Sequence, residues 1–117
     1  KMYDVNNIFA KIIRKEIPST IVYEDEKILF FHDITPQAKV HILVIPKIPV
    51  KDLTDFLNQA DEIAVKYFFD KINEVVKEIG LTKTGFRLVT NNGLDANQEV
   101  PHFHMHILGG ENLNSIR

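Results

Sequence analysis

Hydrophobic and polar positions divide the chain into a block of strand-like segments, a helical segment and a second block of strands. Apolar residues at helical spacing follow two asparagines, which are favourable N-cap residues, and predict a short helix over residues 7–15. Runs rich in β-branched and aromatic residues then predict a hairpin of Thr20–Glu24 and Lys27–His32. A third strand is predicted at Val40–Ile45. It is expected to end there, because the prolines that follow cannot donate to a strand ladder.

In the next segment the spacing of the apolar residues changes. From Asp52 to Ile79 the apolar positions recur every three or four residues, which is typical of an amphipathic helix. The segment predicts one long helix, or a short helix followed by a long one, with Gly80 as a left-handed cap. Two further strands are predicted at Phe86–Thr90 and His102–Leu108, separated by a loop of turn-forming residues over 91–97.

The order of these segments favours an α+β domain. We expect a five-stranded antiparallel sheet with one short and one long helix, and with the helices on one face of the sheet. The chain has 117 residues, which suits one domain. Its hydrophobic content of 44% and charged content of 26% are ordinary for a globular protein. We therefore expect residues 1–117 to form a single domain.

Charge and cysteine content narrow the function classes. The formal net charge of −2 leaves no basic excess for nucleic acid or an anionic membrane, although a local pocket can still be positive. The chain has no cysteine, which excludes disulfides and thiolate zinc sites and fits a reducing compartment. No apolar run approaches the roughly 18–20 residues of a membrane span, and we expect no signal peptide. We expect a cytoplasmic protein, with the nucleus as the alternative.

Three of the five histidines alternate with large apolar residues in the segment Val100–Gly110. Side chains on a strand alternate between two faces, so we predict that one face carries His102, His104 and His106. The intervening apolar side chains then point into the core, and their burial fixes the register. The segment therefore predicts three imidazoles held outward over a pocket.

Three interpretations of these imidazoles are open. The first is a solvated strand face on which the histidines alternate by chance. The second is a metal site, because alternating histidines can present nitrogens to one ion; against it, Glu99 is the only carboxylate near the motif. The third is covalent catalysis, in which one neutral imidazole attacks while its neighbours bind phosphate or protonate a leaving group. We favour the third, because crowded imidazoles titrate as a coupled set and one stays neutral below neutral pH.

Several segments together resemble the histidine-triad family, and its Hint branch in particular. The motif His-x-His-x-His is followed by two apolar residues and Gly109-Gly110. The opening Ile8–Pro18 resembles that of the branch, with the pattern Ile-Phe-x-Lys-Ile-Ile-x-x-Glu-Ile-Pro. The segment Phe31–Lys47 resembles its nucleotide loop and third strand, and Asn91-x-Gly93 lies ahead of the histidines. The resemblance covers residues 8–110 in the family's order.

The resemblance implies a HIT-like fold and a purine nucleoside phosphoramidase. Such an enzyme binds nucleoside monophosphates and hydrolyses bonds at the α-phosphorus, above all phosphoramidates of adenosine or guanosine monophosphate. By resemblance, His104 is the nucleophile that forms a nucleotidyl-imidazole intermediate, and His106 is a phosphate ligand. His102 and His41 are the supporting pair. Strand parity agrees for His41, which shares a strand face with Leu43.

The remaining site residues are implied in the same way. Asp33 is expected to accept hydrogen bonds from the ribose, with the cap of a turn as the alternative role. Apolar side chains are expected to sandwich the base, with ordinary core as the alternative: Ile8, Phe9, Ile12, Phe31, Ile34 and Leu43. Loop residues are expected to meet the phosphate or the leaving group: Asn91, Asn97, Gln98, Glu99 and Val100. We expect His32 to be a surface or packing residue.

The resemblance also implies a homodimer, with the sheets joined edge to edge and the long helices at the interface. A physical reason is the run Tyr67, Phe68 and Phe69, because its apolar side chains extend around more of the helix than one sheet face can cover. No cofactor is expected to be required and no metal ligand is assigned, although zinc can bind. Beyond a purine nucleotide substrate and a second copy of the chain, we expect neither nucleic acid nor membrane as a partner.

Two alternative functions stay open. One is a Fhit-like hydrolase of dinucleoside polyphosphates, which the Gly109-Gly110 pair and the opening segment disfavour. The other is a regulatory module that binds zinc or nucleotide, with incidental hydrolysis. The chain departs from animal Hint proteins at Glu99, where they typically carry a serine and many bacterial relatives carry an acidic residue. We therefore expect Glu99 to influence the choice of leaving group.

Overall fold

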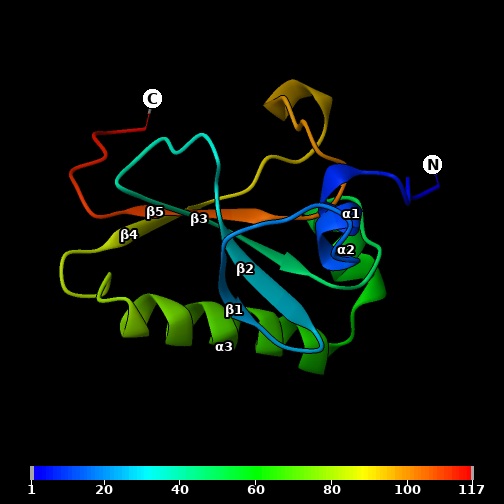
Figure 1. The fold of residues 1–117 in the computed structure, drawn as a ribbon, viewed down its shortest axis with the longest axis horizontal. Coiled ribbons are helices and arrows are strands. Elements are labelled where there is room, and N and C mark those ends of the chain that lie inside the picture. The colour runs from blue at the N-terminus through cyan, green and yellow to red at the C-terminus, as the bar shows by residue number, and fades with distance from the viewer. Residues whose placement is uncertain (1, 117) are drawn as a thin grey trace.

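The computed structural model describes residues 2–116 and contains one antiparallel sheet with helices packed on it (Figure 1). The sheet has the order β1-β2-β3-β5-β4, and all four neighbouring pairs are antiparallel. Its strands are β1 (Ile21–Glu24), β2 (Ile28–His32), β3 (Val40–Pro46), β4 (Phe86–Val89) and β5 (Met105–Gly109). The predicted α+β class and five-stranded antiparallel sheet are confirmed.

Over residues 2–116 the helices are α1 (Ile8–Ile13), α2 (Leu53–Gln59), α3 (Glu62–Glu78) and a 3₁₀ turn η1 (Leu94–Ala96) inside the predicted loop. The cap of α1 is Asn7, whose side-chain oxygen accepts from the Ala10 amide at 2.9 Å. The segment 52–79 takes the second predicted form, a short helix followed by a long one, because Asp61 caps a new helix. None of these helices is long and apolar enough to span a membrane.

Helices cover both faces of the sheet, so the expectation that they lie on one face is wrong. Phe30 of β2 belongs to the main core, which α2 and α3 cover. Its neighbour Phe31 points the other way and packs with Phe9 of α1. The physical reason is that β2 and β3 are apolar at consecutive positions rather than at alternate ones, so both faces need a cover. Figure 1 shows α3 running along one of these faces.

The last strand begins at Met105, three residues later than predicted. Met105 pairs with Val44, so a continued ladder would place Phe103 opposite Pro46. A proline has no amide hydrogen for the ladder. The chain leaves β3 at this point, and the Phe103 amide donates to the Val50 carbonyl at 2.8 Å. Apolar residues of the segment still share the core face, as predicted: Phe103, Met105 and Ile107.

Candidate active site

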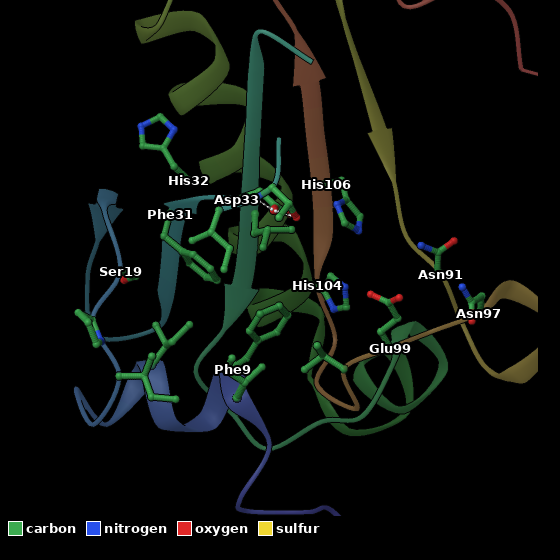
Figure 2. Close-up of a pocket in the computed structure, with 18 of the residues that line it drawn as sticks. Phe9, Ser19, Phe31, His32, Asp33, Asn91, Asn97, Glu99, His104 and His106 are labelled. Carbon is green, nitrogen blue, oxygen red and sulfur yellow. Dashed lines mark hydrogen bonds between the residues drawn. The ribbon is translucent and has the colours of Figure 1, made fainter. Parts of the chain in front are cut away.

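A pocket of about 520 Å³ opens between α1, the ends of β2 and β5, and the loop of residues 91–100 (Figure 2). All but three of the residues predicted for the site line it; the exceptions are His41, His102 and Gln98. One wall is apolar and comes from α1, β2 and β3. Phe9 stands edge-on to Phe31 at 5.6 Å between ring centroids, and edge-on to His104 at 4.9 Å. The apolar wall thus reaches the histidines directly.

His104 presents a nitrogen lone pair. Its Nδ1 lies 2.7 Å from the backbone carbonyl of His102. A carbonyl oxygen can only accept a hydrogen bond, so the proton of His104 is assigned to Nδ1 and Nε2 is left unprotonated. Burial lowers the pKa of His104 below its ordinary value of 6.5, which keeps the ring neutral at neutral pH. A neutral imidazole held in this tautomer is a nucleophile.

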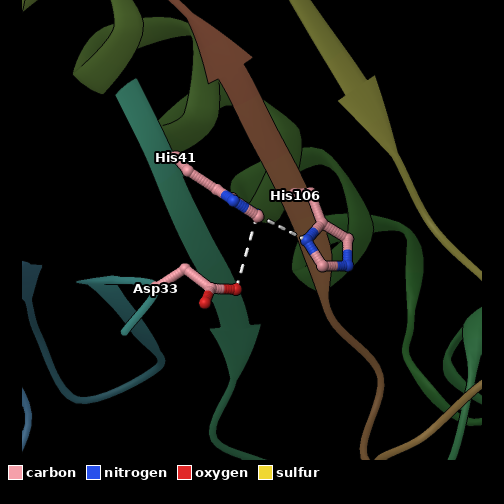
Figure 3. A group of neighbouring side chains, drawn as sticks. All are labelled: Asp33, His41 and His106. Carbon is pink, nitrogen blue, oxygen red and sulfur yellow. Dashed lines mark hydrogen bonds and ion pairs between the residues drawn. The ribbon is translucent and has the colours of Figure 1, made fainter. Parts of the chain in front are cut away.

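His106 is held in the opposite arrangement. The Gln37 amide donates to Nδ1 of His41 at 2.9 Å, so the proton of His41 is on Nε2. That Nε2 lies 2.8 Å from Nδ1 of His106, which therefore accepts (Figure 3). The proton of His106 is then on Nε2, where it can donate. Burial, together with His104 and His41, lowers the pKa of His106 to about 4. The ring centroids of His104 and His106 lie 5.2 Å apart. The neutral ring of His104 offers a lone pair, and that of His106 offers an N–H donor.

His41 does not line the pocket. It is 5% exposed and lies between Asp33 and His106, as Figure 3 shows. Burial lowers its pKa, while the charge of Asp33 opposes the shift. The contacts of His41 place it as a support for His106 rather than as a group in contact with a ligand.

His102 also lies outside the pocket, so the expectation of three imidazoles over one pocket is corrected for this residue. It is fully buried, with Nε2 2.8 Å from the Pro46 carbonyl and Nδ1 2.6 Å from the Tyr3 hydroxyl. The cause is the departure of the chain from β3 before Met105, which turns His102 toward the end of that strand. Only its backbone carbonyl reaches His104.

Asp33 caps a turn, which is the alternative role considered for it, and it also approaches His41. One carboxylate oxygen accepts from the Thr35 amide at 2.8 Å and caps the turn after β2. The other lies 3.4 Å from Nε2 of His41. Atoms of Asp33, His41 and His106 that could ligate a metal ion, one from each residue, all lie within 4.8 Å of one another. A carboxylate therefore does approach the histidines, from a loop distant in sequence, and its apparent absence from the motif is no argument against a metal.

The loop of residues 91–100 contributes the polar wall. Figure 2 shows the Glu99 carboxylate directed toward His104, with Asn91 and Asn97 beside it. Gln98 does not take part, contrary to expectation. Its side chain accepts from the Gly93 amide at 2.9 Å and donates to the Lys51 carbonyl at 2.7 Å. Because the amide oxygen bonds within the loop and the amide nitrogen bonds to Lys51 outside it, Gln98 ties the loop to the segment before α2 instead of meeting a ligand.

Six lining residues were not predicted: Ile17, Pro18, Ser19, His32, Thr35 and Ala96. Ile17 and Pro18 were named only as part of the opening segment Ile8–Pro18 and were not assigned to the site. Their place in the same opening segment as Phe9 is a signal that could have found them, because the apolar wall continues through the turn after α1. His32 is exposed, as expected, but it also stands at the rim of the pocket.

Comparisons with known proteins find relatives and solved structures that match nearly the whole chain. The HIT domain matches residues 14–113. A relative from Zea mays named 14 kDa zinc-binding protein is 48% identical over 117 residues, covering 97% of this chain and 89% of the relative. A histidine triad protein from Clostridium difficile superposes with a TM-score of 0.89 at 44% identity, covering 99% of this chain and 100% of that one. A HIT family hydrolase from Legionella pneumophila superposes with a TM-score of 0.87 at 39% identity, covering 93% and 96%.

Proposed function

Because this chain belongs to the HIT domain family, we propose that it is a cytoplasmic purine nucleoside phosphoramidase, a hydrolase that acts at the α-phosphorus of nucleoside 5′-monophosphate conjugates. One observation carries the proposal: His104 offers a lone pair beside the N–H of His106. Attack on phosphorus needs a nucleophile, and the charge that develops on the phosphoryl oxygens needs a donor. The Legionella pneumophila neighbour, named a hydrolase, supports this reaction class.

The pocket suits a nucleotide from end to end. The purine lies against the apolar wall that includes Phe9 and Phe31, and the ribose hydroxyls donate to Asp33. The phosphate then faces His104 and His106. This order places an apolar ring, a hydroxylated sugar and an anion beside side chains of matching chemistry.

The reaction has two displacements. First, Nε2 of His104 forms a bond to the α-phosphorus, the P–N bond breaks, and the leaving amine takes up one proton from the solvent. The attacking ring becomes cationic, and the His102 carbonyl, which accepts from its Nδ1, stabilises that charge. Water then attacks the phosphorus and releases one proton to the solvent, the bond to His104 breaks, and the nucleoside monophosphate is released. One water molecule is consumed and the imidazole is restored in its starting tautomer.

A turnover comparison tests the substrate class. We expect the protein to hydrolyse an adenosine phosphoramidate with a higher kcat/KM than diadenosine triphosphate. The reverse order would support the Fhit-like alternative. Binding of adenosine monophosphate without turnover of either compound would support a nucleotide-binding module instead.

Zinc binding is a second candidate function, favoured by the grouping of Asp33, His41 and His106. The relative from Zea mays is named a zinc-binding protein. A metal here would need the lone pair on Nε2 of His41, which in the described tautomer carries the proton donated to His106. We propose that zinc is not required for hydrolysis. Zinc content of the purified protein and turnover before and after chelation distinguish the two functions, and loss of turnover on chelation would contradict this proposal.

Glu99 is proposed to select the leaving group. The Glu99 side chain faces the pocket beside His104, where its carboxylate can hold a cationic amine, or its protonated form can give a proton to the departing amine. A fixed negative charge there also repels a second phosphate, which disfavours polyphosphates. We expect Glu99→Gln to lower kcat/KM about tenfold for phosphoramidates with a cationic amine, and less for neutral ones.

The control for this variant is Asp95→Asn, which removes the same charge from η1 in the same loop, at a residue that does not line the pocket. It should leave the preference unchanged. Equal losses on cationic and neutral substrates with Glu99→Gln would assign the proton role to Glu99. No loss on either substrate would remove Glu99 from the reaction.

We also propose a homodimer. β4 lies at an edge of the sheet, where no further strand pairs with it among residues 2–116. Apolar side chains stay partly open on the long helix and on this strand: Phe69 and Phe86 are each 37% exposed. Edge pairing in a second copy would satisfy the free backbone groups and cover such residues. Sedimentation at micromolar concentration should give twice the chain mass, and a strictly monomeric mass would falsify the proposal.

A further inference from the structure

His102 is a buried side chain with two partners that fix its tautomer. The Pro46 carbonyl, 2.8 Å from Nε2, can only accept, so the ring proton is on Nε2. Nδ1 is then an acceptor, and the Tyr3 hydroxyl donates to it at 2.6 Å. The tyrosine ring also stands edge-on to the imidazole, with centroids 5.6 Å apart. His102 is therefore clamped between the end of β3 and the segment that precedes α1.

Tyr3 itself is held by the turn before α1. The Asn7 amide donates to the Asp4 carbonyl at 3.2 Å, and its side-chain amide donates to the same oxygen at 2.7 Å. Arg14 in turn donates to the Val5 carbonyl at 2.8 Å. Since these bonds fix the backbone on the C-terminal side of Tyr3, its hydroxyl is presented to His102 by ordered chain.

The contacts of His102 also connect to the candidate nucleophile, His104. The peptide carbonyl of His102 is the group that accepts from Nδ1 of His104, at 2.7 Å. The position of that carbonyl decides where the lone pair on Nε2 of His104 points. We propose that Tyr3 is a positioning residue of the hydrolytic site: through the side chain of His102, it holds the carbonyl that orients His104. This inference rests on the proposed function.

The test is Tyr3→Phe, which keeps the ring contact and removes the hydroxyl. A buried acceptor without its donor drives the imidazole to shift or to admit water, and the attached carbonyl moves with it. Misplacement of a reacting group by about 1 Å can lower the reaction rate roughly 10²-fold, and we expect a smaller displacement here. We expect kcat for an adenosine phosphoramidate to fall about five- to tenfold, with KM changed by less than about twofold.

The matched control is Tyr67→Phe. The Tyr67 hydroxyl donates to Asp25, on the side of the sheet that α3 covers, so the variant loses a tyrosine hydroxyl bond away from the pocket. Long-range proton–nitrogen NMR spectra of the histidine rings are recorded for both variants and the wild type. We expect the ring nitrogens of His102 and His104 to shift in Tyr3→Phe and to stay in place in Tyr67→Phe.

Three results would overturn the inference while leaving the proposed function intact. They are wild-type kcat in Tyr3→Phe, an equal loss of kcat in Tyr67→Phe, or a loss of kcat in Tyr3→Phe with unchanged His104 nitrogens. If the wild-type protein fails to hydrolyse the phosphoramidate, the proposed function fails by itself. The NMR comparison still decides whether Tyr3 positions His104, because it requires no turnover.

Discussion

Replacing His104 with asparagine is expected to cut turnover by about 10³-fold or more, while nucleotide affinity changes by less than about tenfold. The variant keeps a polar side chain of moderate size but has no nitrogen lone pair for phosphorus. Binding survives because the apolar wall, Asp33 and His106 still face the nucleotide. Single-turnover kinetics with an adenosine phosphoramidate, together with calorimetric titration of adenosine monophosphate, measure the two quantities.

The comparison variant is His106→Ala. We expect it to weaken binding and turnover together, because it removes a donor to the phosphate and leaves the nucleophile in place. If His104→Asn retained a tenth of wild-type turnover while His106→Ala lost all of it, the two roles would have to be exchanged.

Acid is expected to destabilise the fold through its buried histidines. Burial lowers the pKa of His102 from 6.5 to about 4. Between these values the unfolded chain binds a proton that the folded protein does not, so stability is complete above pH 6.5 and is lost as the pH falls toward 4. The loss from His102 alone is on the order of 3 kcal/mol by pH 4. His106, whose pKa is also lowered to about 4, acts in the same direction.

Urea unfolding at a series of pH values across this window measures the effect. The matched variant is His102→Gln, whose amide can donate to Pro46 and accept from Tyr3 but cannot titrate in this range. Its free energy of unfolding should depend less on pH than that of the wild type. If the free energy of unfolding varied with pH identically in the two proteins, His102 would not be the source of the pH dependence.

The sheet could be predicted from the sequence because its signals are local. The alternation of Phe103, Met105 and Ile107 set the core face, and Asn7 marked the start of α1. The cover on both faces of the sheet also had a local signal, the consecutive apolar residues of β2 and β3, but the position of His102 depends on contacts between distant segments. The departure of His102 from the sheet depends on Pro46 occupying the position that a continued ladder would place opposite Phe103, and this register is set only after β3 and β5 have met.

The same limit applies to the site. Strand parity placed His104 and His106 over one pocket, and the pocket lining includes both. Parity could not show that Gln98 would be engaged by Gly93 and Lys51, since a loop amide has no periodic pattern. The contact between Tyr3 and His102 spans 99 positions in the chain and leaves no local signal at all.

We expect His104 to form a covalent bond to phosphorus during turnover. The most direct measurement is mass spectrometry of the wild-type protein mixed with an adenosine phosphoramidate and quenched in base during turnover. We predict an adenylyl group on the peptide that contains the triad, assigned by fragmentation to His104 and absent from His104→Asn. An adenylyl group on His106, or full turnover with no adduct on any histidine, would contradict the claim.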